Sequence, residues 1–292
     1  MTATPATVHA AVTRARLAFE AVGIASPDAD AVELAAFALG CEAADVRRRM
    51  VLRDLADEGF LERFQGLVEE RLARVPVQHL TGRSHFRGLT LAVGPGVFVP
   101  RPETEVVAGL AIEAARGAGP APVVVDLCTG SGAIALAVAD EVPGAHVHAV
   151  ELSREAHAWA ERNVASLGPG VDLRLGDARS AFADLEGAVD VVVCNPPYIP
   201  DGAVPIDPEV RDHDPEVALY GRSADGLSVP LAVAARAATL LREGGALVME
   251  HADTQGESLP AALEGAGVWE EVADHRDLTG RPRATTAVRR RR

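Results

Sequence analysis

The chain has 292 residues, of which 48% are hydrophobic and 24% are charged, and its net charge is −14. This length predicts one large domain with a smaller one, and the composition is typical of a globular protein with a full core. No apolar run approaches the roughly 18 residues of a membrane span, and the start lacks the basic end and apolar block of a signal peptide. The acidity disfavours a nucleic-acid partner, because a phosphate backbone would meet a repulsive field.

The three cysteines, Cys41, Cys128 and Cys194, lie far apart and form no CxxC pair. This spacing argues against a zinc site and against a disulfide framework, and it is typical of a cytoplasmic protein. Single histidines such as His251 and His275 have no partner at ligand spacing, so we expect no metal site. The four arginines that end the chain predict a solvated tail rather than a nucleic-acid arm.

Residues 1–78 are predicted to form a small helical domain. Ser26 can cap a helix that begins at Pro27, and Gly40 is a fitting residue to end it. Residues 60–74 place several apolar side chains on one helical face: Phe60, Phe64, Leu67, Val68 and Leu72. Such a stripe is more often core than a partner groove, so we expect it to pack the helices together.

Residues 79–100 are predicted to be a β-hairpin linker. The runs LTLAV and VFV flank a Gly-Pro-Gly turn, which indicates two short strands. From residue 101 onward, five apolar strands alternate with helical segments, and two further strands at the end of the chain suggest an antiparallel pair. This alternation predicts an α/β fold with a Rossmann-like, mostly parallel, seven-stranded sheet that is covered on both faces.

The first strand of this sheet closes on Asp126, and the chain then turns through Gly130 and Gly132 into a helix. Glycines allow a positive φ and let the backbone approach a ligand closely. The spacing satisfies the dinucleotide pattern G-x-G-x-x-G/A, and Glu151 follows about 20 residues later. Alone, this motif does not distinguish a nicotinamide site from a site for another adenosine ligand. It also does not distinguish a ligand site from a tight turn without a ligand.

Three carboxylates narrow the choice of ligand. Asp126, Glu151 and Asp177 each follow a predicted strand, so they should gather at the carboxyl edge of the sheet. Glu151 is placed to accept hydrogen bonds from ribose hydroxyls, and Asp177 could accept one from an adenine amino group. A site this acidic suits the cationic S-adenosylmethionine better than a pyrophosphate. The alternative for each carboxylate is a helix N-cap, and Asp177 is the most prone to be that alone.

The apolar strand VDVVVC runs directly into Asn195-Pro196-Pro197-Tyr198. The side-chain oxygen of Asn195 and the carbonyl oxygen of Pro196 are two acceptors that match the two hydrogens of a planar amino group. The prolines stiffen this turn, and Tyr198 supplies a flat ring for stacking on an amide or a base. The motif therefore predicts a pocket for an –NH2 group.

Such a pocket can direct a weakly nucleophilic nitrogen at a sulfonium methyl group. Holding both N–H bonds turns the nitrogen lone pair toward the methyl carbon, and orientation of this kind supplies about 7–11 kcal/mol in well-aligned systems. The acceptors also stabilise the positive charge that develops on nitrogen. No dedicated general base is needed, because the proton can leave after transfer.

With these motifs the chain resembles the bacterial release-factor glutamine N5-methyltransferases, a group of S-adenosylmethionine-dependent methyltransferases. The resemblance covers nearly the whole chain and lies in six strings: QHLTG at 78–82, PRPETE at 100–105, DLCTGSGAIALA at 126–137, NPPYIP at 195–200, MEHADTQGE at 249–257 and HRDLTGRPRAT at 275–285. The N-P-P-Y motif also occurs in adenine-N6 DNA methyltransferases and some rRNA methylases, so the first two strings are the specific ones. One departure is Cys128, where the family often has glycine; a negative φ would tolerate it.

The resemblance implies methyl transfer from S-adenosylmethionine to the side-chain amide of the glutamine in the Gly-Gly-Gln motif of peptide-chain release factors. It also implies that residues 101–292 are the methyltransferase domain and that residues 1–78 help to dock the protein substrate. The cofactor-binding residues it implies are Asp126, Cys128, Thr129, Gly130, Ser131, Gly132, Glu151, Asp177, Ala178 and Asn195. The residues it implies for the glutamine are Asn195, Pro196, Pro197 and Tyr198, with Asn195, Pro196 and Tyr198 catalytic.

Three alternatives stay open from the residues alone. A DNA adenine-N6 or rRNA amino-group methyltransferase would need a basic domain or interleaved aromatic and basic residues, and the chain has neither. A nicotinamide oxidoreductase fits the glycine loop but leaves residues 195–198 unexplained. A non-catalytic adenosine-binding module would need no acceptor pair. We therefore expect a release factor as partner, with no direct nucleic-acid contact and no membrane.

Overall fold

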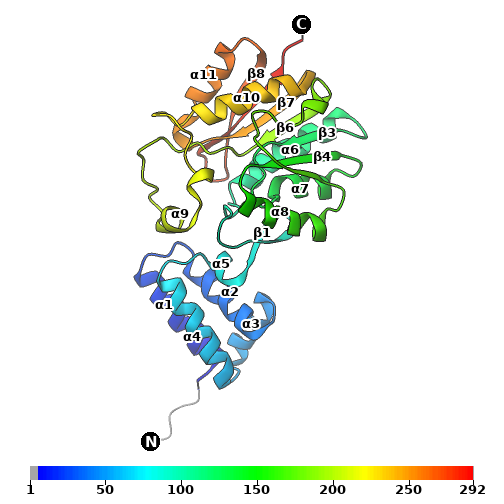
Figure 1. Cartoon of the computed structure of the whole chain (residues 1–292). Helices are drawn as coiled ribbons and strands as arrows, with labels where there is room; N and C mark the ends of the chain where they lie inside the picture. The colour runs from blue at the N-terminus through cyan, green and yellow to red at the C-terminus, as the bar shows by residue number, and fades with distance from the viewer. Residues whose placement is uncertain (1–5, 292) are drawn as a thin grey trace, which may run out of the picture. The chain divides into compact units, whose positions relative to one another are not determined.

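The computed structural model describes residues 6–291 (Figure 1). Residues 1–5, at the start of the expected helical domain, and Arg292, the last of the arginine tail, lie outside the described residues. The chain divides into two compact units: unit 1 comprises Met1–Arg83 and Ile206–His213, and unit 2 comprises the rest. The sequence-based domain boundaries, and the roles given to those domains, stay predictions. No helix in the described part combines the length and apolarity that a membrane crossing needs.

Unit 1 is helical, as expected for this part of the chain. Its helices are α1 (Val8–Ala21), α2 (Pro27–Leu39), α3 (Ala43–Leu52), α4 (Glu58–Leu72), α5 (Val77–Thr81) and α9 (Pro208–His213). Helix α2 has the bounds predicted from Pro27 and Gly40, and Gly40 ends it in the left-handed conformation with a φ of 63°. The Ser26 side chain, however, makes no capping hydrogen bond.

The apolar stripe predicted for α4 does pack the helices of unit 1 together. Phe60 and Phe64 are buried, and their ring centroids lie 5.3 Å apart. The same helix carries Arg71, whose guanidinium is buried and donates to Asp30 at 2.8 Å and to Glu209 at 2.6 Å. A buried cation must be paired to be tolerated, and this pairing ties α9 into unit 1.

The predicted hairpin exists, but only one of its two strands lies where it was expected: LTLAV contains the second strand of the hairpin, whereas VFV forms no strand. Strands β1 (Arg83–Phe86) and β2 (Leu89–Ala92) form a two-stranded sheet around the turn at 87–88. The Gly-Pro-Gly segment is not the hairpin turn, and Val97 and Val99 after it are buried core residues outside any strand.

The position of the turn follows from Arg87, which adopts a φ of 50°. Its backbone N–H donates to Glu105 Oε1 at 2.9 Å, and its guanidinium forms a bidentate pair with Glu141. These contacts, made with residues distant in sequence, hold a non-glycine residue in the left-handed region, which turn propensities alone did not indicate.

The large sheet of unit 2 has seven strands in the order β5-β4-β3-β6-β7-β9-β8. The strands are β3 (Val123–Asp126), β4 (His146–Glu151), β5 (Asp172–Leu175), β6 (Val189–Cys194), β7 (Leu241–Glu250), β8 (Trp269–Arg276) and β9 (Pro282–Arg289). The first five strands of the order run parallel, and β9 is antiparallel to both β7 and β8. The predicted Rossmann-like, mostly parallel, seven-stranded sheet is therefore confirmed.

Helices cover both faces of this sheet. The helices of unit 2 are α6 (Thr104–Ala118), α7 (Ala133–Glu141), α8 (Arg154–Leu167), α10 (Ser228–Leu240) and α11 (Ser258–Gly265), with short 3₁₀ helices at Ala183–Leu185, Glu216–Ala218 and Asp253–Gln255. Alternate strand residues enter two separate cores: Val191 and Val193 pack with α6 and α7, whereas Val192 and Cys194 pack with α10 and α11. This explains why the strands read as continuous apolar runs.

The sheet order places one topological switch at its centre. From β3 the chain continues outward to β4 and β5, and it then returns to β6 on the other side of β3. Asp126 is in register with Val193, and Cys194 is in register with Met249. The carboxyl ends of β3, β4, β6 and β7 therefore meet at one edge, where ligands bind in open α/β sheets.

Candidate active site

The loop after β3 is held in a conformation that requires glycine. Gly130 and Gly132 have φ values of 57° and 88°. A Cβ built on Gly130 meets no protein atom within 4 Å, so the glycine is required by its φ and leaves one backbone face uncrowded by the protein. Cys128 is not among the described non-glycine residues with a positive φ, which meets the condition set for its departure from the family pattern.

Asp126 lies beneath this loop and is fully buried. Its carboxylate accepts hydrogen bonds from the Thr129 hydroxyl at 2.7 Å and from the Cys128 backbone N–H at 3.4 Å. Burial raises the pKa of Asp126 to about 6, and the Thr129 hydrogen bond opposes this shift. In this structure Asp126 therefore orders the loop.

Glu151 ends β4 and reaches across to the same loop. One carboxylate oxygen accepts from the Gly130 N–H at 2.8 Å, and the other accepts from the Ser153 N–H at 2.8 Å. Burial raises the pKa of Glu151, and the backbone hydrogen bonds work against this effect. The predicted neighbours Gly130 and Glu151 are thus in direct contact.

Asp177 follows β5, whose last residue, Leu175, is in register with Glu151. Its carboxylate accepts from the Arg179 backbone N–H at 2.9 Å and pairs with the Arg179 guanidinium at 2.5 Å, which lowers the pKa of Asp177. Ala178 packs against the core on the α10 side of the sheet. The helix N-cap weighed as the alternative for Asp177 is not found, because a turn and not a helix follows it. Its contact with adenine stays a prediction.

A buried amide fastens the glycine loop from behind. Asn163 on α8 donates to the Ser131 carbonyl at 2.9 Å, and it exchanges hydrogen bonds with both backbone groups of Ala92 in the hairpin. Asn163 was not predicted from the sequence, because an asparagine inside an amphipathic helix carries no signal of its tertiary partner.

The Asn-Pro-Pro-Tyr turn begins directly after β6. Asn195 Nδ2 lies 3.5 Å from the Thr104 hydroxyl, to which it donates. Within residues 6–291, Asn195 Oδ1 and the Pro196 carbonyl oxygen accept no hydrogen bond from the protein. No donor from the described residues therefore occupies the two acceptors that the sequence predicts; Asn195 is half-buried and Pro196 is buried. Pro197 follows them as the second rigid residue of the turn.

Tyr198 is anchored at both its backbone and its ring. Its carbonyl accepts from Gln255 Nε2 at 3.0 Å, and its hydroxyl donates to Glu250 Oε1 at 3.2 Å. Burial, together with the neighbouring Glu250 carboxylate, raises the pKa of Tyr198, so the phenol stays protonated. The structure thus holds the ring that sequence reasoning assigned to stacking.

Three residues beside the turn were missed: Thr104, Glu250 and Gln255. A signal for Glu250 was present, since an acid closes the apolar strand ALVME just as Asp126 and Glu151 close theirs. Thr104 and Gln255 lie in the strings PRPETE and MEHADTQGE, which supported the resemblance without a role for either residue.

Comparison with known proteins agrees with the fold and the motifs. Residues 10–82 match the PrmC N-terminal domain, and residues 91–207 match the methyltransferase small domain. A release factor glutamine methyltransferase of Streptomyces coelicolor is 52% identical over 91% of this chain and 92% of its own length. One of Bifidobacterium longum is 45% identical over 91% of this chain and 94% of its own length.

A further relative carries a different name. The 4-amino-L-phenylalanine/4-methylamino-L-phenylalanine methyltransferase of Streptomyces pristinaespiralis is 44% identical over 72% of this chain and 73% of its own length. The first two matches are higher in identity and coverage than this one, and they confirm the resemblance drawn from the motifs. The chain belongs to the family of release factor glutamine methyltransferases, which are S-adenosylmethionine-dependent enzymes.

Proposed function

We propose that this enzyme transfers a methyl group from S-adenosylmethionine to the side-chain amide nitrogen of the glutamine in the Gly-Gly-Gln motif of peptide-chain release factors. The observation that carries the proposal is the pair of free acceptors, Asn195 Oδ1 and the Pro196 carbonyl, at the end of β6. They lie beside the strand that leads into the glycine loop. Acceptor pair and cofactor loop thus share one edge of the sheet.

The residues of the loop fit S-adenosylmethionine. The uncrowded backbone face at Gly130 allows close approach, and Glu151 is a carboxylate at the end of the second strand of the sheet. Asp126 and Asp177 add negative charge, which suits a ligand with a sulfonium and an ammonium group. When bound, the cofactor supplies the electrophilic methyl group.

The residues of the turn act on the amide that is to be methylated. Asn195 Oδ1 and the Pro196 carbonyl accept its two N–H bonds, which directs the nitrogen lone pair and stabilises the charge that develops there. Pro197 keeps the acceptors fixed, and the Tyr198 ring stacks on the amide plane. A proton is released from nitrogen after transfer, so the turn needs no base.

The identity of the substrate rests on three points. The relatives named as release factor glutamine methyltransferases match more than nine-tenths of this chain. The net charge of −14 disfavours the alternative of a DNA or rRNA substrate. A glutamine flanked by glycines can also enter a narrow pocket without neighbouring side chains. The relative named for 4-amino-L-phenylalanine indicates an arylamine as the second candidate, because such an amine presents the same two hydrogens.

Mass spectrometry of a release factor incubated with the enzyme and S-adenosylmethionine tests the proposal. We expect a gain of one methyl group on the Gly-Gly-Gln glutamine and none on a Gln→Glu release factor, which lacks the amino group. Parallel reactions contain 4-amino-L-phenylalanine, adenine-containing DNA and rRNA. Methylation of one of these with an untouched release factor would contradict the proposal.

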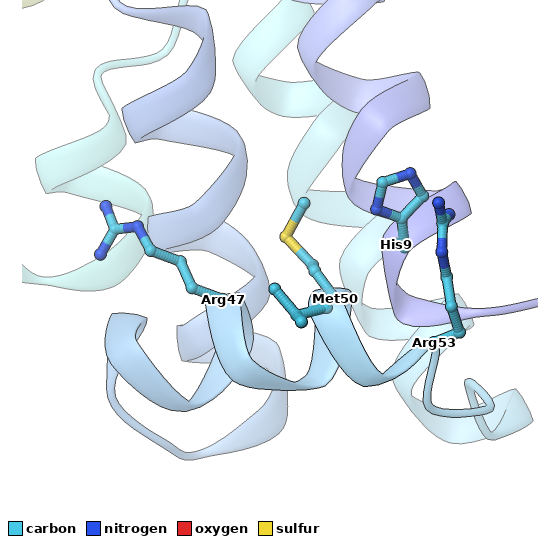
Figure 2. A pocket seen from close by; sticks show the side chains of 5 residues that line it. His9, Arg47, Met50 and Arg53 are labelled. Atoms are coloured by element: carbon cyan, nitrogen blue, oxygen red, sulfur yellow. The ribbon is translucent and has the colours of Figure 1, made fainter.

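We propose further that unit 1 contacts the release factor through a surface on α3. A hollow of about 420 Å³ is lined by His9, Arg47, Met50, Val51 and Arg53. Figure 2 shows Arg47 and Arg53 on either side of Met50, with His9 of α1 nearby. Val51 is 81% exposed, and neither arginine forms an ion pair within the described part of the chain. Unpaired cations on a strongly acidic protein favour an acidic, partly apolar segment of the substrate.

Charge reversal tests this contact. The double variant Arg47→Glu, Arg53→Glu should raise KM for the release factor about five- to tenfold, because rim charges govern encounter and orientation. Cofactor affinity should not change. Arg48→Glu is the matched control, since Arg48 lies on the same helix but pairs with Asp45 at 3.7 Å and does not line the hollow. Equal effects of control and double variant would argue against this surface.

A further inference from the structure

Glu250 is a buried carboxylate beside the substrate turn to which no role has been given. It ends β7 and is only 2% exposed. The Tyr198 hydroxyl donates to Oε1 at 3.2 Å, whereas Oε2 is buried and has no partner of good geometry among the described residues. A buried acid is costly to retain, so its position calls for an explanation.

Thr104, the first residue of α6, connects Glu250 to Asn195. Its hydroxyl receives the Asn195 Nδ2 hydrogen bond at 3.5 Å. The same hydroxyl interacts with the Glu250 carboxylate and lowers the pKa of Glu250, although burial has the larger effect and raises that pKa to about 7. The charged groups that also act on Glu250 are Arg283 of β9, which favours its ionised form, and Glu103, which opposes it.

The number of hydrogens fixes the direction of these contacts. An ionised carboxylate only accepts hydrogen bonds, and a threonine hydroxyl has a single hydrogen. When Thr104 gives that hydrogen to Glu250, its oxygen can only accept from Asn195. The amide of Asn195 then turns its NH2 group to Thr104 and leaves Oδ1 for an external donor.

We propose that Glu250 is a positioning residue that sets the direction of the hydrogen bonds around the acceptor pocket: through Thr104 it presents Asn195 Oδ1 to the substrate, and directly it fixes the Tyr198 ring. This inference rests on the proposed function, in which Asn195 and Tyr198 hold the glutamine amide. It explains why a carboxylate is buried behind a turn whose working atoms are neutral.

A pair of substitutions at Thr104 tests the chain of contacts. Thr104→Val keeps the shape but removes the hydroxyl, so Asn195 loses its anchor; we expect kcat to fall about ten- to a hundredfold, less than for a residue that touches substrate. Thr104→Ser restores the hydroxyl and should recover most of that loss. KM for the release factor and cofactor affinity by calorimetry should change little in both variants.

Thr285→Val is the matched control. Thr285 is fully buried on β9, in register with Met249 of β7, and its hydroxyl has no hydrogen-bond partner in the described structure. Its loss should leave kcat unchanged. If Thr104→Val also left kcat unchanged, or if Thr104→Ser were as slow as Thr104→Val, the inference would be overturned.

The pH profile of kcat separates positioning from mere packing. Glu250→Gln introduces a donor that can point at Thr104 and reverse the network, so kcat should fall about tenfold or more. The wild type should lose activity on the acid side as Glu250 becomes protonated, and Glu250→Gln should lack this pH dependence. An unchanged profile in the variant would refute the role of Glu250. Wild-type enzyme that methylates no release factor would instead refute the proposed function, so the two failures are distinguishable.

Discussion

The two halves of the sheet edge differ in how their acceptors are used. On the side of β3, β4 and β5, the carboxylates of Asp126, Glu151 and Asp177 already accept hydrogen bonds from the chain itself. On the side of β6, Asn195 Oδ1 and the Pro196 carbonyl accept none within the described residues. The acids of the first half are engaged by the chain itself, whereas this pair of acceptors in the second half is not.

This difference indicates two ways of building a binding site. The acids on the first side order the backbone of the glycine loop, so a ligand there shares or replaces contacts that exist already. On the second side, Asn195 is anchored from behind by Thr104, and the proline turn keeps the Pro196 carbonyl in place. Preorganisation of this kind affects rate more than affinity. The following variants test this contrast.

The largest effect is expected for Asn195→Ala. It removes one of the two free acceptors, so methyl transfer should fall by about 10²–10³. Cofactor affinity should stay nearly intact, because the proposed function assigns this acceptor to the substrate nitrogen and not to the cofactor. Single-turnover kinetics and calorimetry measure the two quantities separately. A variant that lost cofactor binding but kept its turnover would assign Asn195 to the other half of the edge.

The second-largest effect is expected on the pH dependence of stability when Glu250 is replaced by glutamine. Its pKa rises from 4.5 to about 7 on folding, so the folded state binds its proton more tightly than the unfolded state. The contribution to stability is therefore present below about pH 4.5 and is lost as the pH rises through 7. Glu250→Gln cannot ionise, and its free energy of unfolding relative to wild type should increase from pH 4.5 to pH 8 by on the order of 3 kcal/mol. Urea unfolding at both pH values measures this; a constant difference would show that Glu250 does not titrate there.

Glu151→Ala should have a smaller effect, confined to the cofactor. The carboxylate is a candidate acceptor for ribose hydroxyls and also receives the Gly130 N–H. Its loss should weaken S-adenosylmethionine binding by about 1–3 kcal/mol, the usual range for a charge-assisted hydrogen bond. Calorimetry is the measurement. Tight binding of a nicotinamide dinucleotide, with no response to S-adenosylmethionine, would contradict the cofactor assignment.

The contrast between the two halves also shows what sequence can predict. The strands, their parallel order and the residues at their ends follow from apolar runs and from the rule that such ends meet at one edge. The position of Glu250 at the end of a strand follows from the same rule, but its partners, and the part played by Thr104, depend on contacts between α6, β7 and the turn. No local pattern encodes a hydroxyl that accepts from the Asn195 amide and gives its own hydrogen to Glu250.

The hairpin shows the same limit in the backbone. Gly-Pro-Gly is the stronger turn signal, yet the chain turns at Arg87, because Glu105 and Glu141 hold that residue. Turn propensity correctly predicted a hairpin in this segment, but it placed the hairpin turn at Gly-Pro-Gly. Two tertiary contacts, the hydrogen bond to Glu105 and the ion pair with Glu141, fix the turn at Arg87.

The smallest effect is expected for Asp177→Ala, although sequence reasoning placed Asp177 beside Glu151 in the same site. The Asp177 side chain is 31% exposed and is paired with the Arg179 guanidinium, so solvent and Arg179 both screen its charge. Its removal should weaken cofactor binding by less than about 1 kcal/mol, in the range of exposed ion pairs. Arg179→Ala is the control: it frees the carboxylate, and affinity should hold or rise slightly if Asp177 contacts the adenine amino group. A loss as large as that of Glu151→Ala would mean that Asp177 changes partner when the cofactor binds, and that its pairing with Arg179 is broken in the complex.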